Sequence, residues 1–295
     1  MKFVTPWCRQ KYTGEKEMFK KIFVLICIIS MLAMPVSAAD TYGGYNIPVD
    51  IAVNGSFIKC AQKPIMINNT TYIPLRAFSD AIGGSIDWNA KTNAATMKKS
   101  GHTFVFYTQT NNCVIDGVKK NYKSVVYKDL TFVPIRAISE VLGYKVQWDD
   151  TYLVVKITAS GVNVPTKCKD WSYSSEDIVY LSKIVQKESG YQSFKAKLGV
   201  AGTVMNRVKS SQFPNTVKAV IYDTKYGVQF PPAHTDGFVK TVPSKESVIA
   251  AKCALRGINV VRNSLYFIST KNAPQSWAHK NRPFYTTING MSFYE

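Results

Sequence analysis

Glu188 is the residue whose type and position are best suited to acid–base chemistry. Apolar residues recur at helical spacing from Ile178 to Val185, and Glu188 continues the same face. The helix is expected to end directly behind it, at Gly190. Poor hydration and the negative end of the helix dipole both disfavour ionisation, so the pKa of this carboxyl is expected to rise. An acid that stays protonated near neutral pH can donate a proton to a departing glycosidic oxygen. The alternative is a glutamate solvated at the surface.

A second helix, expected over residues 198–208, is rich in small residues. Glycine or alanine stands at positions 199, 201 and 202, which lets a neighbouring helix approach closely. Asn206 and Arg207 lie near its end, and Phe213-Pro214-Asn215 follows. We expect one of Asn206 and Arg207 to hold the helix pair or Glu188, and the other to face solvent or a glycan.

Together these segments resemble the SleB-type cell wall hydrolases, which include spore cortex-lytic enzymes. The family pattern has a glutamate, a helix of small residues, an N-R-V sequence about eighteen residues on and then F-P-N-T. Here Asn206 follows Glu188 by eighteen residues. The likeness covers roughly residues 174–294 and implies that Glu188 is catalytic. The residues expected to bind substrate that match the family pattern are Asn206, Arg207, Gln229, Phe230, Tyr266 and Trp277. Gln192, four residues after Glu188, is also expected to bind sugar hydroxyls.

The resemblance implies a mainly helical, lysozyme-like domain that degrades peptidoglycan with one glutamate as general acid and then base. In the lytic transglycosylase version, the C6 hydroxyl of the muramic acid closes a 1,6-anhydro ring, so a single carboxyl suffices. The chain departs from the family at Gln192, where a second glutamate is common, at Ala196 and in the last residues, where a histidine is usual. A water-using muramidase, an N-acetylmuramoyl-L-alanine amidase and a non-catalytic wall-binding protein are the alternatives.

The first part of the chain contains an internal repeat with an offset of 60 residues. Residues 71–83 recur as 131–143, and Trp88 has its counterpart in Trp148. Each unit is expected to form a short strand, a helix of about nine residues that starts at a proline and ends at a glycine, and a second strand. Residues 103–107 and 152–157 are expected to be strands because apolar and polar residues alternate there.

This repeat resembles the stalk domain named after the N-terminal domain of copper amine oxidases, in two copies over residues 47–158. The resemblance implies a small α+β fold, and Arg76, Arg136 and both tryptophans are expected to hold it together. The name does not imply copper. The segment has a single histidine, His102, so we expect no metal and no cofactor.

The N-terminus has the three parts of a secretory signal peptide within residues 1–39. Lys20-Lys21 precede an apolar run over residues 22–34, and small residues follow. Translation starts at Met1 or at Met18. A run of 13 apolar residues is short for a membrane span, which needs roughly 20. We therefore expect a secreted protein of the cell wall or spore envelope, in contact with the membrane only if the signal segment stays uncleaved.

The chain has 295 residues and a net charge of +18, which favours polyanionic partners. Export argues against nucleic acid and for peptidoglycan glycan strands and anionic wall polymers. Four cysteines remain after the signal segment, and we interpret them as buried free thiols, although three disulfide pairings are possible. We expect a multi-domain protein: the α+β repeat domain over 47–158, a linker over 159–173 and the mainly α hydrolase domain over 174–295.

Overall fold

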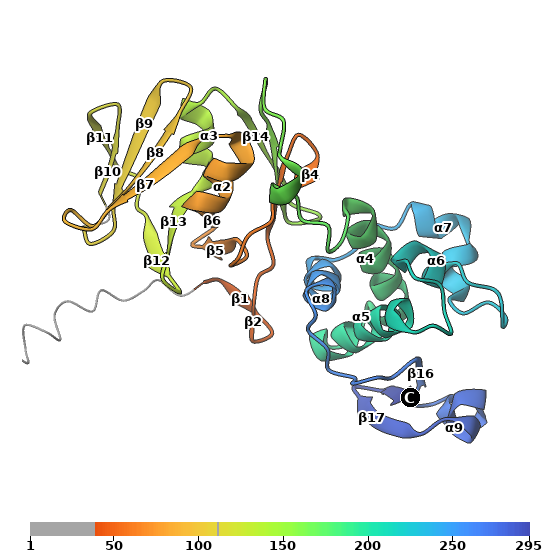
Figure 1. Ribbon diagram of the computed structural model, residues 1–295. Coiled ribbons are helices and arrows are strands. Elements are labelled where there is room, and N and C mark those ends of the chain that lie inside the picture. The colour runs from red at the N-terminus through yellow and green to blue at the C-terminus, as the bar shows by residue number, and fades with distance from the viewer. Residues whose placement is uncertain (1–38, 111) are drawn as a thin grey trace, which may run out of the picture. The chain divides into compact units, whose positions relative to one another are not determined.

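The computed structural model describes residues 39–110 and 112–295 (Figure 1). The predicted signal segment lies outside the described residues. The described chain consists of a β-rich first domain followed by a helical second domain, as expected. None of the helices within residues 39–110 and 112–295 is long and apolar enough to cross a membrane.

The first domain is built from three antiparallel or mixed sheets, whose strand orders are β14-β15-β3-β4, β12-β13-β6-β5 and β11-β10-β9-β8-β7. A separate hairpin, β1–β2, precedes them. One pairing is parallel, because β3 near the start of the domain lies beside β15 at its end, with Asp50 opposite Val154. The strands are β1 (Thr41–Tyr42), β2 (Tyr45–Asn46), β3 (Asp50–Val53), β4 (Ser56–Phe57), β5 (Ile65–Ile67), β6 (Thr70–Pro74), β7 (Ser85–Asn89), β8 (Ala94–Lys99), β9 (His102–Tyr107), β10 (Asn112–Ile115), β11 (Val118–Lys120), β12 (Val125–Tyr127), β13 (Leu130–Pro134), β14 (Lys145–Asp149) and β15 (Val154–Thr158).

Two short helices, α2 (Leu75–Ile82) and α3 (Ile135–Val141), cover the sheets of this domain. Each follows a proline at the N-cap, and Gly83 ends α2 in the left-handed conformation at φ 71°. Both helices are shorter than the nine residues expected. Their buried faces are apolar and belong to one core cluster with the strands.

The arginines and the first tryptophan do not hold the first domain together, contrary to our expectation. Arg76 and Arg136 are exposed because they lie on the solvent side of these helices. Trp88 is 47% exposed. Trp148 alone packs against the core, and its indole N–H donates a hydrogen bond to Asp150 at 3.1 Å.

The second domain is held by three helices, α4 (Ser175–Ser189), α5 (Phe194–Lys209) and α8 (Lys245–Leu255), which pack against one another. Ser174 caps α4: its hydroxyl accepts from the N–H of Asp177 at 3.1 Å, and the Asp177 carboxylate accepts from the N–H of Ser174 at 2.8 Å. Shorter helices are α6 (Val217–Ile221), α7 (Asp236–Val239) and α9 (Trp277–Asn281).

A three-stranded antiparallel sheet at the end of the chain was not expected from the sequence. Its strand order is β16-β18-β17, with β16 (Tyr266–Ser269), β17 (Phe284–Ile288) and β18 (Met291–Tyr294). Figure 1 shows this sheet beside α5. The small residues of α5 make room for it: a Cβ added at Gly199 would lie 2.7 Å from the ring of Phe293. At Gly199 the close neighbour is therefore a strand, while α5 also packs against the helices α4 and α8.

The predicted linker, residues 159–173, packs on the first domain. Its short 3-10 helix η2 (Thr166–Cys168) is followed by an antiparallel bridge between Lys169 and Ile58, and the N–H of Lys59 donates to the carbonyl of Cys168 at 2.8 Å. Val164 and Cys168 are buried in the core of that domain. The four cysteines within the described residues, Cys60, Cys113, Cys168 and Cys253, are buried free thiols.

Candidate active site

Helix α4 places Glu188 one residue before its end and on its buried side. The buried face of α4 begins with Ile178 and continues through Leu181, Ile184 and Val185. Gly190 ends the helix in a crowded position, because a Cβ there would clash with Gln186. Glu188 continues this face, and its Oε1 is buried.

The carboxyl of Glu188 is half-buried, and burial raises its pKa from the ordinary value of 4.5 to about 7. The positive charge of Arg207 opposes that rise but does not cancel it. One carboxylate oxygen, Oε1, is buried and has no hydrogen-bond partner among the described residues. Near neutral pH such a group exists in both protonation states, which is the requirement for proton transfer in both directions.

Arg207, near the end of α5, is the charged neighbour of Glu188 and is only 4% exposed. Its Nε donates to the carbonyl of Leu265 at 2.7 Å, while Nη1 is buried and unpaired within the described residues. Three rings surround the guanidinium: its central carbon lies 4.8 Å from the ring centroid of Phe213, 5.1 Å from Phe230 and 5.5 Å from Tyr266. Burial lowers the pKa of Arg207 to about 10, which leaves it charged at neutral pH.

A chain of stacked side chains leads from this buried arginine to the surface. Tyr266 contacts Trp277 edge to face, with ring centroids 5.6 Å apart. Arg282 lies over both rings, at 5.0 Å and 5.1 Å, and its Nη2 donates to the Tyr266 hydroxyl at 3.2 Å. Trp277 is 55% exposed and ends the chain at the surface. An exposed indole held by neighbours is suited to stacking on a sugar ring.

The structure divides Asn206 and Arg207 in a way that the sequence left open. The Asn206 amide donates to the carbonyls of Arg262 and Ser264 at 2.8 and 3.0 Å, and its oxygen accepts from Asn259 at 3.0 Å. Asn206 thus ties α5 to the loop before β16. Arg207 faces inward toward Glu188. Neither side chain is free to face a glycan as we had expected of one of them.

The remaining expected substrate contacts are placed as follows. Phe230 is 1% exposed, so it packs in the core against Phe267 and Arg207 and cannot touch a substrate, contrary to expectation. Gln229 donates a hydrogen bond to the carbonyl of Gly227 at 3.0 Å within its own loop. Gln192 lies just beyond Glu188 and is partly exposed, and its carbonyl accepts from Lys197 at 2.6 Å. Tyr266 and Trp277 stay together, as described above.

Two residues belong to this site that were not assigned a role from the sequence. Arg282 binds Tyr266 and Trp277, and its Nε is buried and unpaired within the described residues. The negative charge of Asp223, like that of Glu188, raises the pKa of Arg207 and so favours its charged form. The Arg-Pro pair at 282 was visible in the sequence, but nothing local placed it beside Tyr266.

A separate hollow of about 170 Å³ lies on the first domain. The exposed side chains of Arg76, Trp88 and Asp129 are part of its lining.

Comparison with known proteins agrees with both resemblances. Residues 191–294 match the family model described as Cell Wall Hydrolase, and residues 52–157 and 114–170 match the Copper amine oxidase N-terminal domain. Over these residues the second domain is thus similar to cell wall hydrolase domains. Glu188 lies three residues before the matched range.

More particularly, the relatives are SleB-type enzymes. A spore cortex-lytic enzyme of Bacillus cereus is 31% identical over 117 residues, which cover 40% of this chain and 42% of the relative. One of Oceanobacillus iheyensis is 28% identical over 116 residues and 39% of each chain. The catalytic domain of the germination-specific lytic transglycosylase SleB from Bacillus anthracis shares 28% identity with a TM-score of 0.38, over 43% of this chain and 99% of that domain. The chain spans about two fifths of the length of the curated relatives it matches.

Proposed function

We propose that the second domain degrades peptidoglycan as a lytic transglycosylase that cleaves the bond between N-acetylmuramic acid and N-acetylglucosamine. The observation that carries the proposal is the Glu188 carboxyl, which burial holds at a pKa of about 7 at the end of α4. The match to the Cell Wall Hydrolase family and the spore cortex-lytic relatives supports the same substrate class.

In the proposed reaction Glu188 acts twice. Its protonated carboxyl donates the proton to the glycosidic oxygen, which leaves as the 4-hydroxyl of N-acetylglucosamine while positive charge develops at C1 of the muramic acid. The carboxylate then takes the proton from the C6 hydroxyl, whose oxygen bonds to C1 and closes the 1,6-anhydro ring. The proton balance returns Glu188 to its starting state, so no water and no second carboxyl is required.

Arg207 supports the ionised state that exists between these two steps. Its guanidinium is fixed by Leu265 and by the three rings, so its charge is already in place when the carboxylate forms. Trp277 is proposed to stack on a sugar of the glycan, with Tyr266 and Arg282 behind it. Gln192, partly exposed just beyond Glu188, is proposed to bind sugar hydroxyls.

Mass spectrometry of purified sacculi tests this proposal. The wild-type chain is expected to release 1,6-anhydro-muropeptides, and Glu188→Gln is expected to release none. Glu176→Gln is the matched control, because Glu176 is exposed on the same helix and pairs only with Lys218 in the described structure. Reducing ends without anhydro-sugars would indicate a water-using muramidase, free stem peptides an amidase, and sedimentation with sacculi without products a non-catalytic wall-binding protein.

We further propose that the chain is exported and works at the cell wall or spore envelope. The two-copy stalk-like domain and the net positive charge of the chain would then serve attachment to anionic wall polymers. Binding to sacculi should therefore weaken as salt rises. Sedimentation at low and high ionic strength measures this, and salt-independent binding would contradict it.

A further inference from the structure

Asp50 of the first domain lies at the centre of a buried ionic network. Its side-chain partners are Tyr173, at the end of the linker, and Lys252 and Arg256, at the C-terminal end of α8. Its carboxylate oxygens lie 2.8 Å from Nζ of Lys252 and 2.8 Å from Nη2 of Arg256. The hydroxyl of Tyr173 donates to the same carboxylate at 2.8 Å. Asp50 and Lys252 are buried, so these contacts are hidden from water and screened little by salt.

The backbone of the first domain completes the network. Nζ of Lys252 also donates to the carbonyls of Tyr152 and Leu153 at 2.9 and 2.7 Å, and Nη2 of Arg256 donates to the carbonyl of Val49 at 2.7 Å. These carbonyls are adjacent because β3 and β15 pair in parallel there. Nζ of Lys252 thus lies within 2.9 Å of three first-domain oxygens, two carbonyls and one carboxylate oxygen of Asp50.

The charges of this network depend on the contact between the domains. Burial by itself raises the pKa of Asp50, but Lys252 and Arg256 outweigh that effect and hold the pKa well below its usual range. Removal of either side would leave a buried charge without its partner, which is strongly destabilising. Around the network, Phe57 and Leu153 of the first domain share one apolar cluster with Ile178 of α4.

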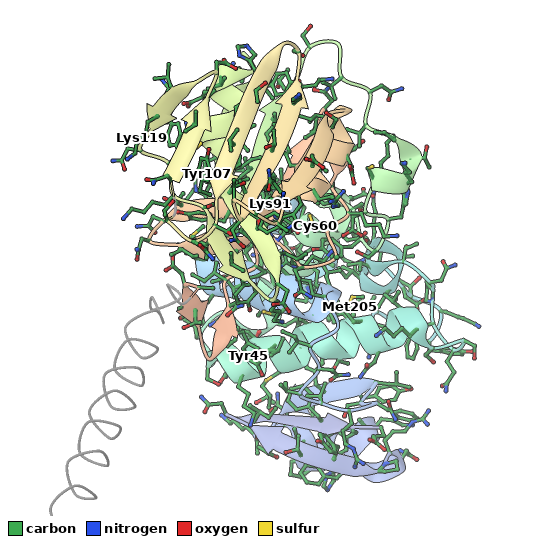
Figure 2. The ribbon with its side chains drawn as sticks, turned by 60° about the vertical axis from the view of Figure 1, so that its left-hand side comes forward. Tyr45, Cys60, Lys91, Tyr107, Lys119 and Met205 are labelled. Atoms are coloured by element: carbon green, nitrogen blue, oxygen red, sulfur yellow. The ribbon has the colours of Figure 1, made fainter. Side chains whose placement is uncertain are left out.

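A second contact holds the opposite end of α8. The hairpin β1–β2 places Tyr42 edge to face on Phe194 at 5.2 Å, and the Tyr42 hydroxyl bonds to Glu246 in the first turn of α8. Glu246 also pairs with the buried Lys197 of α5 at 2.9 Å. Figure 2 shows Tyr45 of the same hairpin beside α5, and its ring centroid lies 6.1 Å from that of Phe194.

Both contacts meet on α8, which packs against α4 and α5, the helices that carry Glu188 and Arg207. We propose that the first domain is an intramolecular partner of the second: it fixes α8 at both ends, through Asp50 and through the hairpin β1–β2, so that the two domains unfold as one unit. The first domain is then part of the framework of the site as well as a stalk. This inference does not rest on the activity proposed above.

Calorimetry of the full chain tests the coupling without reference to activity. We expect a single cooperative transition, lowered by about 10 °C in Asp50→Asn, because this change leaves Lys252 and Arg256 buried without a counter-charge. The matched control is Asp80→Asn, at an exposed position of the same domain, with an expected change within about 2 °C. Two independent transitions in the wild type, or equal effects of the two variants, would overturn the proposal.

A second measurement keeps the proposal testable if Asp50→Asn does not fold. A protease site inserted between the exposed residues Trp171 and Ser172 allows the native chain to be cut between the domains. The two fragments are expected to elute together in gel filtration under native conditions. Elution as two separate folded fragments would show that the domains are independent and would refute the proposal.

Discussion

Replacing Glu188 with Gln should stabilise the protein at pH 8, although it removes the group that we propose to be catalytic. Burial raises the pKa of Glu188 from 4.5 to about 7. In linkage terms the folded state therefore binds the proton more tightly than the unfolded state, and the stability of the wild type falls as pH rises from 4.5 to 7. Each unit of pKa difference is worth ~1.4 kcal/mol, so ionisation costs the folded state about 3 kcal/mol above pH 7.

The glutamine side chain of the variant cannot ionise. The variant therefore lacks the loss of folding stability that ionisation of Glu188 causes in the wild type at high pH. We expect urea unfolding to show Glu188→Gln more stable than wild type by about 2–3 kcal/mol at pH 8, relative to the difference between the same two proteins at pH 4. Comparing the stability difference at pH 8 with that at pH 4 removes any pH-independent effect of the amide group on stability. Glu176→Gln, exposed on the same helix, should show no such change. A difference between wild type and Glu188→Gln that is the same at pH 4 and pH 8 would refute the reasoning.

Three further predictions concern the same site and its support. The kcat/KM for muropeptide release should fall above about pH 7, where Glu188 loses its proton. Arg207→Met should move this fall to higher pH, because the charge of Arg207 lowers the pKa of Glu188, while Arg207→Lys keeps the charge and should leave the fall nearly in place. The pH–rate profiles of wild type and the two variants measure this. Trp277→Ala should raise KM for glycan by about tenfold, the order expected for one lost stacking contact, with Tm unchanged, because Trp277 is 55% exposed; an unchanged KM would remove its role as a platform. Gly199→Ala should destabilise the fold by about 1–3 kcal/mol in urea unfolding, since its Cβ would lie 2.7 Å from Phe293; a neutral effect would contradict the close packing.

The features predictable from the sequence are those set by neighbours along the chain. The burial of Glu188 follows from the helical spacing of Ile178 to Val185, and the start of α4 follows from the Ser174 cap. The two resemblances also depend on contiguous motifs, and the family models match the same parts of the chain. Local periodicity together with contiguous motifs therefore indicated the candidate acid, and the motifs gave the order of the domains.

The features that escaped prediction depend on pairings between distant residues. Phe230 was expected to bind substrate, and for Arg207 the sequence left open whether it holds Glu188 or faces a glycan. The chain at Leu265 covers Arg207, and the side chains of Arg207 and Phe230 pack together inside. Asp50 and Arg256 are 206 residues apart, and no local pattern marks either as a partner of the other. Arg76 and Arg136 were expected to hold the first domain together because they recur in the repeat, but both are exposed. A position that recurs in a repeat need not be buried.

The proposed chemistry requires that the Glu188 carboxyl is shielded enough from water to keep its proton near neutral pH. A titration of ¹³C-carboxyl-labelled glutamate by NMR, with the Glu188 signal assigned by its loss in Glu188→Gln, measures this directly. We expect a midpoint near pH 7. A midpoint near the ordinary value of 4.5 would contradict it.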